Sequence, residues 1–106
     1  ILGIGTNGHI AFNEPGSSRY SATRIVDLTD NTINDNSRFF DPLEPIPTQA
    51  FTMGLSSIFD AKKIYLMAVG KHKEKILEEA VYGDIHEGLP ASYLQQHPNC
   101  EVLYCD

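Results

Sequence analysis

The sequence has few basic residues, only two cysteines and no long apolar run, and each shortage excludes a class of protein. Eight Lys and Arg against fourteen Asp and Glu leave a formal net charge of −6 over 106 residues, which argues against a nucleic-acid partner. No signal peptide is recognisable, and no apolar run approaches the roughly 18 residues of a membrane span, so we expect no membrane partner. Cys100 and Cys105 are spaced for neither a C-x-x-C site nor an easy disulfide. We therefore expect reduced, buried thiols in a cytoplasmic protein.

The length suits one small domain with a single core, and no internal repeat, low-complexity tract or linker divides it. The sequence starts at Ile1, inside an apolar stretch and without an initiator Met. We therefore expect residues 1–106 to be one part of a longer domain.

The most informative stretch is a glycine-rich loop that follows the apolar residues at the start. Gly3, Gly5 and Gly8 match the G-x-G-x-x-G pattern of dinucleotide-binding proteins. That interpretation requires a helix of several turns opening at the third glycine. Only six residues separate Gly8 from the turn-forming stretch that begins at Pro15, which is too short for such a helix. The alternative is a loop that presents Asn7, His9 and Glu14 to a cleft at the carboxyl edge of a sheet.

The rest of the chain alternates between predicted strands and predicted helices. A helix is expected to begin near Pro47 or Thr48, because proline suits the first helical turn, and to bury Phe51, Leu55 and Ile58. The near-continuous apolar run at 64–69 is typical of a parallel strand covered on both faces. The other expected strands are 24–29 and 102–104, and the other expected helices are 30–40, 71–82 and 90–96. Strands separated by helices predict an α/β fold with a mainly parallel sheet.

Residues 5–17 resemble the active-site loop of glucosamine-6-phosphate deaminases, and further similar segments lie at 21–24, 36–40, 52–54, 60–63 and 94–98. The block from His9 to Pro15 is the specific part, since the related phosphogluconolactonases share only a glycine–histidine turn. The resemblance implies a partial Rossmann-like domain, and it places this chain in the C-terminal portion of family members. It also implies conversion of glucosamine 6-phosphate and water to fructose 6-phosphate and ammonia, without a cofactor or metal.

The same resemblance assigns chemical roles within the loop. Opening a pyranose ring requires a group that titrates near neutrality, and histidine is the side chain that does so. His9 becomes the ring-opening acid–base and Glu14 its carboxylate partner. Asn7 stands where many family members have aspartate, so it can orient the imidazole without adding negative charge. Judged without the family, His9 and Glu14 would be ordinary loop residues and Asn7 a turn former.

The resemblance also implies a phosphate site formed by Arg38 and Lys73, with Gly8 as a further substrate-binding residue. Lys73 follows strand 64–69 at a predicted helix start, which is a suitable seat for a phosphate. The structural alternatives are a solvated Lys73 and an Arg38 stacked on Phe39. The remaining histidines, which show no metal-ligand spacing and are expected at the surface or in caps, are His72, His86 and His97.

Several alternatives remain open from the sequence. The aspartate that removes the C2 proton in the family is expected upstream of Ile1, so this chain alone would lack a complete active site. A galactosamine-6-phosphate isomerase or a phosphogluconolactonase-like hydrolase would keep the fold and change the sugar. A non-catalytic sugar-phosphate sensor would bind a small-molecule amino-sugar phosphate without turning it over. The oligomeric state is open, and a homo-oligomer is among the choices.

Overall fold

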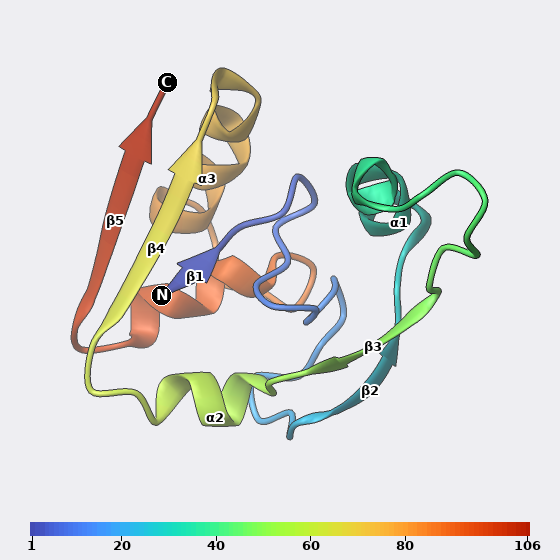
Figure 1. The fold of residues 1–106 in the computed structure, drawn as a ribbon. Coiled ribbons are helices and arrows are strands. Elements are labelled where there is room, and N and C mark those ends of the chain that lie inside the picture. The colour runs from blue at the N-terminus through green and yellow to red at the C-terminus, as the bar shows by residue number, and fades with distance from the viewer.

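The computed structural model describes residues 1–106 and contains two small sheets. The first is parallel and has three strands in the order β1 (Leu2–Gly3), β4 (Ile64–Val69) and β5 (Cys100–Cys105), as Figure 1 shows. The second is an antiparallel pair of β2 (Arg24–Asp27) and β3 (Gln49–Thr52). The predicted α/β class with a parallel sheet is confirmed, and the antiparallel pair is an addition to it.

Helices cover one face of the parallel sheet. A 3₁₀ turn at Lys71–Lys73 leads into α3 (Glu74–Tyr82), which packs with a long 3₁₀ segment at Pro90–Gln96. The first helix, α1 (Asp30–Asn36), continues into a 3₁₀ turn at Ser37–Phe39 and stands apart from the parallel sheet, beyond the glycine loop (Figure 1). The helices expected at 30–40, 71–82 and 90–96 are therefore confirmed, the last of them as a 3₁₀ helix.

The hydrophobic core lies between the parallel sheet and the helices on that face. Along β4 the side chains of Ile64, Leu66 and Ala68 are buried, whereas Met67 and Val69 are 44% and 66% exposed. Within residues 1–106 only one face of this strand is covered, whereas the apolar run predicted two covered faces. The thirteen buried apolar residues are Ile4, Ile10, Leu55, Ile58, Ile64, Leu66, Ala68, Leu77, Ala80, Leu89, Ala91, Tyr93 and Leu94.

The helix predicted from Pro47 is the clearest error. The chain forms β3 first, and helix α2 (Leu55–Phe59) begins only after Gly54. Phe51 pairs with Ile25 across the antiparallel ladder and is 78% exposed, so it belongs to no buried helical face. Gly54 allows the close approach that ends β3, since a Cβ there would lie 2.2 Å from the carbonyl carbon of Ala22. Leu55 and Ile58 are buried as predicted.

The expectation of buried cysteines also needs correction. Both cysteines are free, but Cys100 is half-buried and Cys105 is exposed, because β5 lies at an edge of the sheet. His97 is buried and caps the C-terminal end of the 3₁₀ segment at Pro90–Gln96, one of the two places expected for it, and its Nε2–H donates to the carbonyl of Ala61 at 2.8 Å. None of the helices combines the length and the apolar character that a membrane-spanning helix requires.

Candidate active site

The glycine loop follows β1 and closes on itself. The backbone N–H of Gly8 donates to the carbonyl of Gly5 at 3.0 Å, and the N–H of Gly5 donates to the carbonyl of His9 at 2.9 Å. Gly8 has a φ of +87°, a conformation that favours glycine, and a Cβ there would lie 2.0 Å from Cδ1 of Leu89. No helix opens at Gly8, as the argument against a dinucleotide site requires.

A cleft of about 500 Å³ lies at the carboxyl ends of β1 and β4. This is the edge at which α/β sheets place their ligands. Three of the predicted site residues, His9, Arg38 and Lys73, meet in its lining, although they lie far apart in the sequence. The complete lining is Gly3, Ile4, Gly5, Thr6, His9, Ala11, Asp35, Asn36, Arg38, His72 and Lys73.

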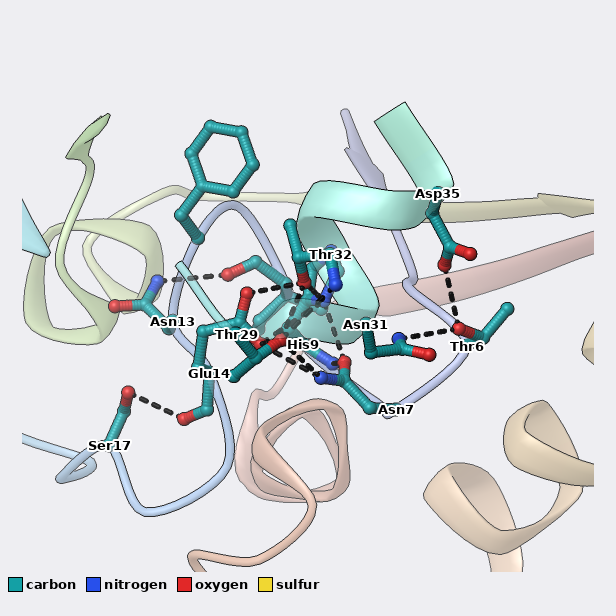
Figure 2. A network of polar contacts seen from close by, with 12 residues as sticks. Thr6, Asn7, His9, Asn13, Glu14, Ser17, Thr29, Asn31, Thr32 and Asp35 are labelled. Carbon is teal, nitrogen blue, oxygen red and sulfur yellow. Dashed lines mark hydrogen bonds and ion pairs between the residues drawn. The ribbon is translucent and has the colours of Figure 1, made fainter. Parts of the chain in front are cut away.

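The other three predicted residues, Asn7, Gly8 and Glu14, are not part of this lining. Both backbone groups of Gly8 are paired within the chain, because its carbonyl accepts from the N–H of Ala91. Asn7 and Glu14 lie against the imidazole, where Figure 2 shows them. Their place is thus around His9 rather than at the cleft surface.

Asn7 lies between the imidazole and the carboxylate, and its amide can be oriented without ambiguity. The Nδ2 group donates to Oε2 of Glu14 at 2.8 Å, and Oδ1 accepts from the backbone N–H of His9 at 3.2 Å. The same Oδ1 lies 2.7 Å from Nδ1 of His9. Since an amide oxygen only accepts hydrogen bonds, Nδ1 carries the proton. The unprotonated Nε2 makes no hydrogen bond to the protein and belongs to a ring that lines the cleft.

Burial sets the protonation state of His9. The side chains of His9 and Glu14 are only 12% and 9% exposed, and Nδ1 of His9 lies 3.6 Å from Oε2 of Glu14. Desolvation lowers the pKa of His9 below its usual value, and the Lys73 ammonium lowers it further, while Glu14 and Asp35 oppose this by favouring the imidazolium. His9 is therefore neutral at neutral pH and available as a base.

The two cations of the cleft occupy different settings. The ammonium of Lys73 contacts the carbonyl of Ile4 at the end of β1, and burial lowers the pKa of Lys73, with an opposing contribution from Asp35. The guanidinium of Arg38 donates to the carbonyl of Asp35 at 2.9 Å and lies 4.5 Å from the ring centre of Phe39. Arg38 thus stacks on Phe39, which is the alternative to a phosphate contact that the sequence left open, and it also lines the cleft.

Sequence reasoning missed two threonines of this site. Thr29 caps α1 by accepting from the backbone N–H of Thr32, and its hydroxyl lies 3.2 Å from Oε2 of Glu14. The hydroxyl of Thr32 donates to Oε1 of Glu14 at 2.6 Å (Figure 2). A threonine just before a polar helix is a recognised capping signal, but nothing in the sequence shows that Thr32 faces a carboxylate.

Comparison with known proteins identifies the family to which the chain belongs. The family described as glucosamine-6-phosphate isomerases/6-phosphogluconolactonase matches residues 1–104. The chain belongs to this family. Within the glucosamine-6-phosphate isomerase/6-phosphogluconolactonase family, it is 53% identical over 106 residues to a glucosamine-6-phosphate deaminase of Staphylococcus haemolyticus, covering all of this chain and 44% of that protein. A glucosamine-6-phosphate deaminase of Oenococcus oeni is also 53% identical, over 103 residues, with 97% of this chain and 44% of that protein covered.

Solved structures agree with the family assignment. A monomeric glucosamine-6-phosphate deaminase superposes with a TM-score of 0.94 at 42% identity, covering 98% of this chain and 43% of that one. A 6-phosphogluconolactonase from Trypanosoma brucei shares the fold, with a TM-score of 0.69 at 20% identity over 98% of this chain and 38% of that one. The chain spans less than half the length of these relatives. The matches support the family but not the predicted placement in the C-terminal portion of its members.

Proposed function

We propose that the protein containing this chain is a glucosamine-6-phosphate deaminase in which His9 opens the sugar ring. One observation carries the proposal. The imidazole of His9 has its Nδ1–H held by Asn7 and its Nε2 free, in a cleft that also contains Arg38 and Lys73. The 53% identity to named deaminases supports this choice of reaction within the family.

The proposed step moves one proton. Nε2 of His9 takes the proton of the C1 hydroxyl, and the carbonyl at C1 forms as the bond from C1 to the ring oxygen breaks. The same proton then passes from Nε2 to the ring oxygen, which gives the open-chain aldehyde and restores the neutral imidazole. Glu14, 3.6 Å from the ring, stabilises the transient imidazolium. Deprotonation at C2 and the release of ammonia are assigned to no residue of this chain.

Arg38 and Lys73 are proposed to bind the 6-phosphate of the substrate. Lys73 ends the 3₁₀ turn that opens α3, where backbone N–H groups and the helix dipole favour an anion. Arg38 approaches the cleft from the 3₁₀ turn after α1. Gly8 is retained as the residue that shapes the turn before His9, and Asn7 as the residue that fixes its tautomer.

The test is a product assay on the full-length protein with three substrates: glucosamine 6-phosphate, galactosamine 6-phosphate and 6-phosphogluconolactone. We expect ammonia and fructose 6-phosphate from the first substrate at a rate well above any turnover of the other two. Hydrolysis of the lactone as the main activity, or binding of the amino sugar without ammonia release, would each show that the proposal is wrong.

His9→Gln tests the assigned step. Turnover of the cyclic substrate should fall by about 10²- to 10⁴-fold, the usual worth of a positioned acid–base. In the reverse direction, open-chain fructose 6-phosphate and ammonia react without a ring-opening step. The His9→Gln variant should therefore still exchange the C1 proton of fructose 6-phosphate with solvent. His86→Gln, a change at an exposed histidine outside the cleft, is the matched control and should retain full activity. If C1 exchange is lost as completely as turnover, His9 takes part in more than ring opening, and the assignment of His9 to that step alone is wrong.

A further inference from the structure

We propose that Thr32 is a positioning residue. Its hydroxyl contacts both the carboxylate of Glu14 and Nδ1 of His9, and it thereby fixes the position of both side chains relative to helix α1. The proposal rests on the proposed function, because it assigns Thr32 a part in the ring-opening step. It concerns a residue that never reaches the cleft itself.

The contacts of Thr32 are unusual for a threonine in a polar helix. Its side chain is fully buried, and Oγ1 lies 2.6 Å from Oε1 of Glu14. The same oxygen is 3.2 Å from Nδ1 of His9 and 3.2 Å from the hydroxyl of Thr29. These contacts form a cluster of four polar side chains in which every buried nitrogen and oxygen atom has a hydrogen-bond partner (Figure 2): His9, Glu14, Thr29 and Thr32.

The direction of these hydrogen bonds follows from their chemistry. A hydroxyl has one proton to donate, and an ionised carboxylate only accepts. The short contact to Glu14 therefore takes the proton of Thr32, as expected for a charge-assisted bond. The lone pairs of Thr32 then face the Nδ1–H of His9, which is shared between the hydroxyl and the closer amide oxygen of Asn7.

Glu14 and His9 depend on such intermediates. Their direct separation of 3.6 Å exceeds hydrogen-bond length. Two neutral groups bridge the gap: the amide of Asn7, which is two residues from His9, and the hydroxyl of Thr32, which is 23 residues away. Only the second bridge requires a separate element of the fold to be in place.

Helix α1 is that element, and it also faces the cleft. Thr6 fastens it to the glycine loop, because its hydroxyl donates to Oδ2 of Asp35 and accepts from Nδ2 of Asn31, each at 2.8 Å. Asp35, Asn36 and Arg38, on α1 and its 3₁₀ extension, line the cleft. One continuous segment therefore carries both the proposed phosphate contact and the group that bridges Glu14 to His9.

Removing the hydroxyl should change how His9 titrates. In Thr32→Val, which keeps the shape of the side chain, Nδ1–H loses an acceptor and Glu14 loses its closest donor. An imidazolium N–H makes a stronger hydrogen bond than a neutral one, so the lost acceptor costs the charged form of His9 more than the neutral form. The substitution therefore lowers the pKa of His9. The other charged groups that face His9 are Lys73 and Asp35, and neither touches Thr32.

The experiment measures the titration of His9 by ¹H–¹⁵N NMR in the full-length protein, without substrate, for wild type, Thr32→Val and Thr32→Ser. We expect the midpoint of His9 to move to lower pH in the valine variant and to return toward wild type in the serine variant. Thr52→Val is the control. It removes another buried hydroxyl, which contacts the backbone of Phe12 and Met53, and should leave the midpoint unchanged even if the protein unfolds at lower temperature.

The kinetics of the same variants separate the two proposals. For an active deaminase, Thr32→Val should lower kcat about tenfold to a hundredfold, leave KM within about twofold and move the acid limb of the pH–rate profile to lower pH. An active wild type whose His9 titrates identically in Thr32→Val would overturn the role of Thr32. A wild type without deaminase activity would overturn the proposed function, and a shifted His9 midpoint in Thr32→Val would still support the positioning contact.

Discussion

Replacing Gly5 with alanine should displace the His9 imidazole, the proposed acid–base, while leaving the rest of the cleft intact. A Cβ at this position would lie 2.1 Å from Cε1 of His9 and 2.4 Å from each ring nitrogen. Carbon atoms that do not share bonds prefer about 3.5–4.0 Å. The ring must therefore retreat by more than about 1 Å, and doing so breaks the 2.7 Å hydrogen bond between Nδ1 and Asn7.

The size of the effect follows from that displacement. A catalytic group misplaced by about 1 Å costs roughly 10² in rate, so kcat of Gly5→Ala should fall about a hundredfold. KM should change little, because the nearest atoms to the new methyl group all belong to His9 and the charges of Arg38 and Lys73 are kept. Overpacking at a semi-rigid site also costs about 1–3 kcal/mol of stability. Ammonia release gives the first quantity and thermal unfolding gives the second.

A matched variant isolates the cause. Gly88→Ala also places a methyl group against an imidazole, with Cβ 2.9 Å from Nδ1 and 3.0 Å from Cε1 of His86. The side chain of His86 is exposed and can turn away, so activity should stay at the wild-type level. A Gly5→Ala enzyme with kcat within twofold of wild type would refute the argument, since His9 would then tolerate a displacement that acid–base catalysis does not allow.

Two further predictions concern charge in the cleft. Asn7→Asp should raise the pKa of His9 by adding an anion beside Nδ1, so the acid limb of the pH–rate profile should move to higher pH, and an unmoved limb would show that this limb does not report the ionisation of His9. Arg38→Ala and Lys73→Ala should each weaken binding of glucosamine 6-phosphate by about tenfold to a hundredfold while leaving binding of unphosphorylated glucosamine unchanged. Calorimetry on both sugars measures this, and an equal loss for the two sugars would place the phosphate elsewhere.

The local patterns in the sequence were sufficient to locate the site but not to orient its groups. A glycine loop after an apolar strand and a lysine after a second strand meet at one sheet edge whenever the strands are parallel, so His9 and Lys73 could be predicted to share a cleft. The contribution of Thr32 could not be predicted, because it depends on how α1 docks against residues far away in the chain.

The mistaken helix at Pro47 has a similar origin. Apolar residues at 51, 55 and 58 fit helical spacing, but Phe51 is in fact on the exposed face of a two-stranded ribbon. Strand pairing with Arg24–Asp27 is a long-range interaction, and it overrides a short periodic pattern. The error at Cys105 follows from the same limit, since an apolar strand at an edge of a sheet cannot be told from a central one by its composition.

The orientation of the Asn7 amide constrains the route of the proton. An amide oxygen accepts a hydrogen bond but does not take up a proton near neutral pH, so the Nδ1 proton of His9 stays where Asn7 holds it. Whatever proton Nε2 collects must leave again from Nε2. Ring opening moves a proton from the C1 hydroxyl to the ring oxygen of the sugar, and both oxygens are bonded to C1. A single imidazole nitrogen can therefore serve both oxygens with a small tilt of the imidazole. A substrate whose donor and acceptor lay on opposite sides of the imidazole would gain nothing from this site.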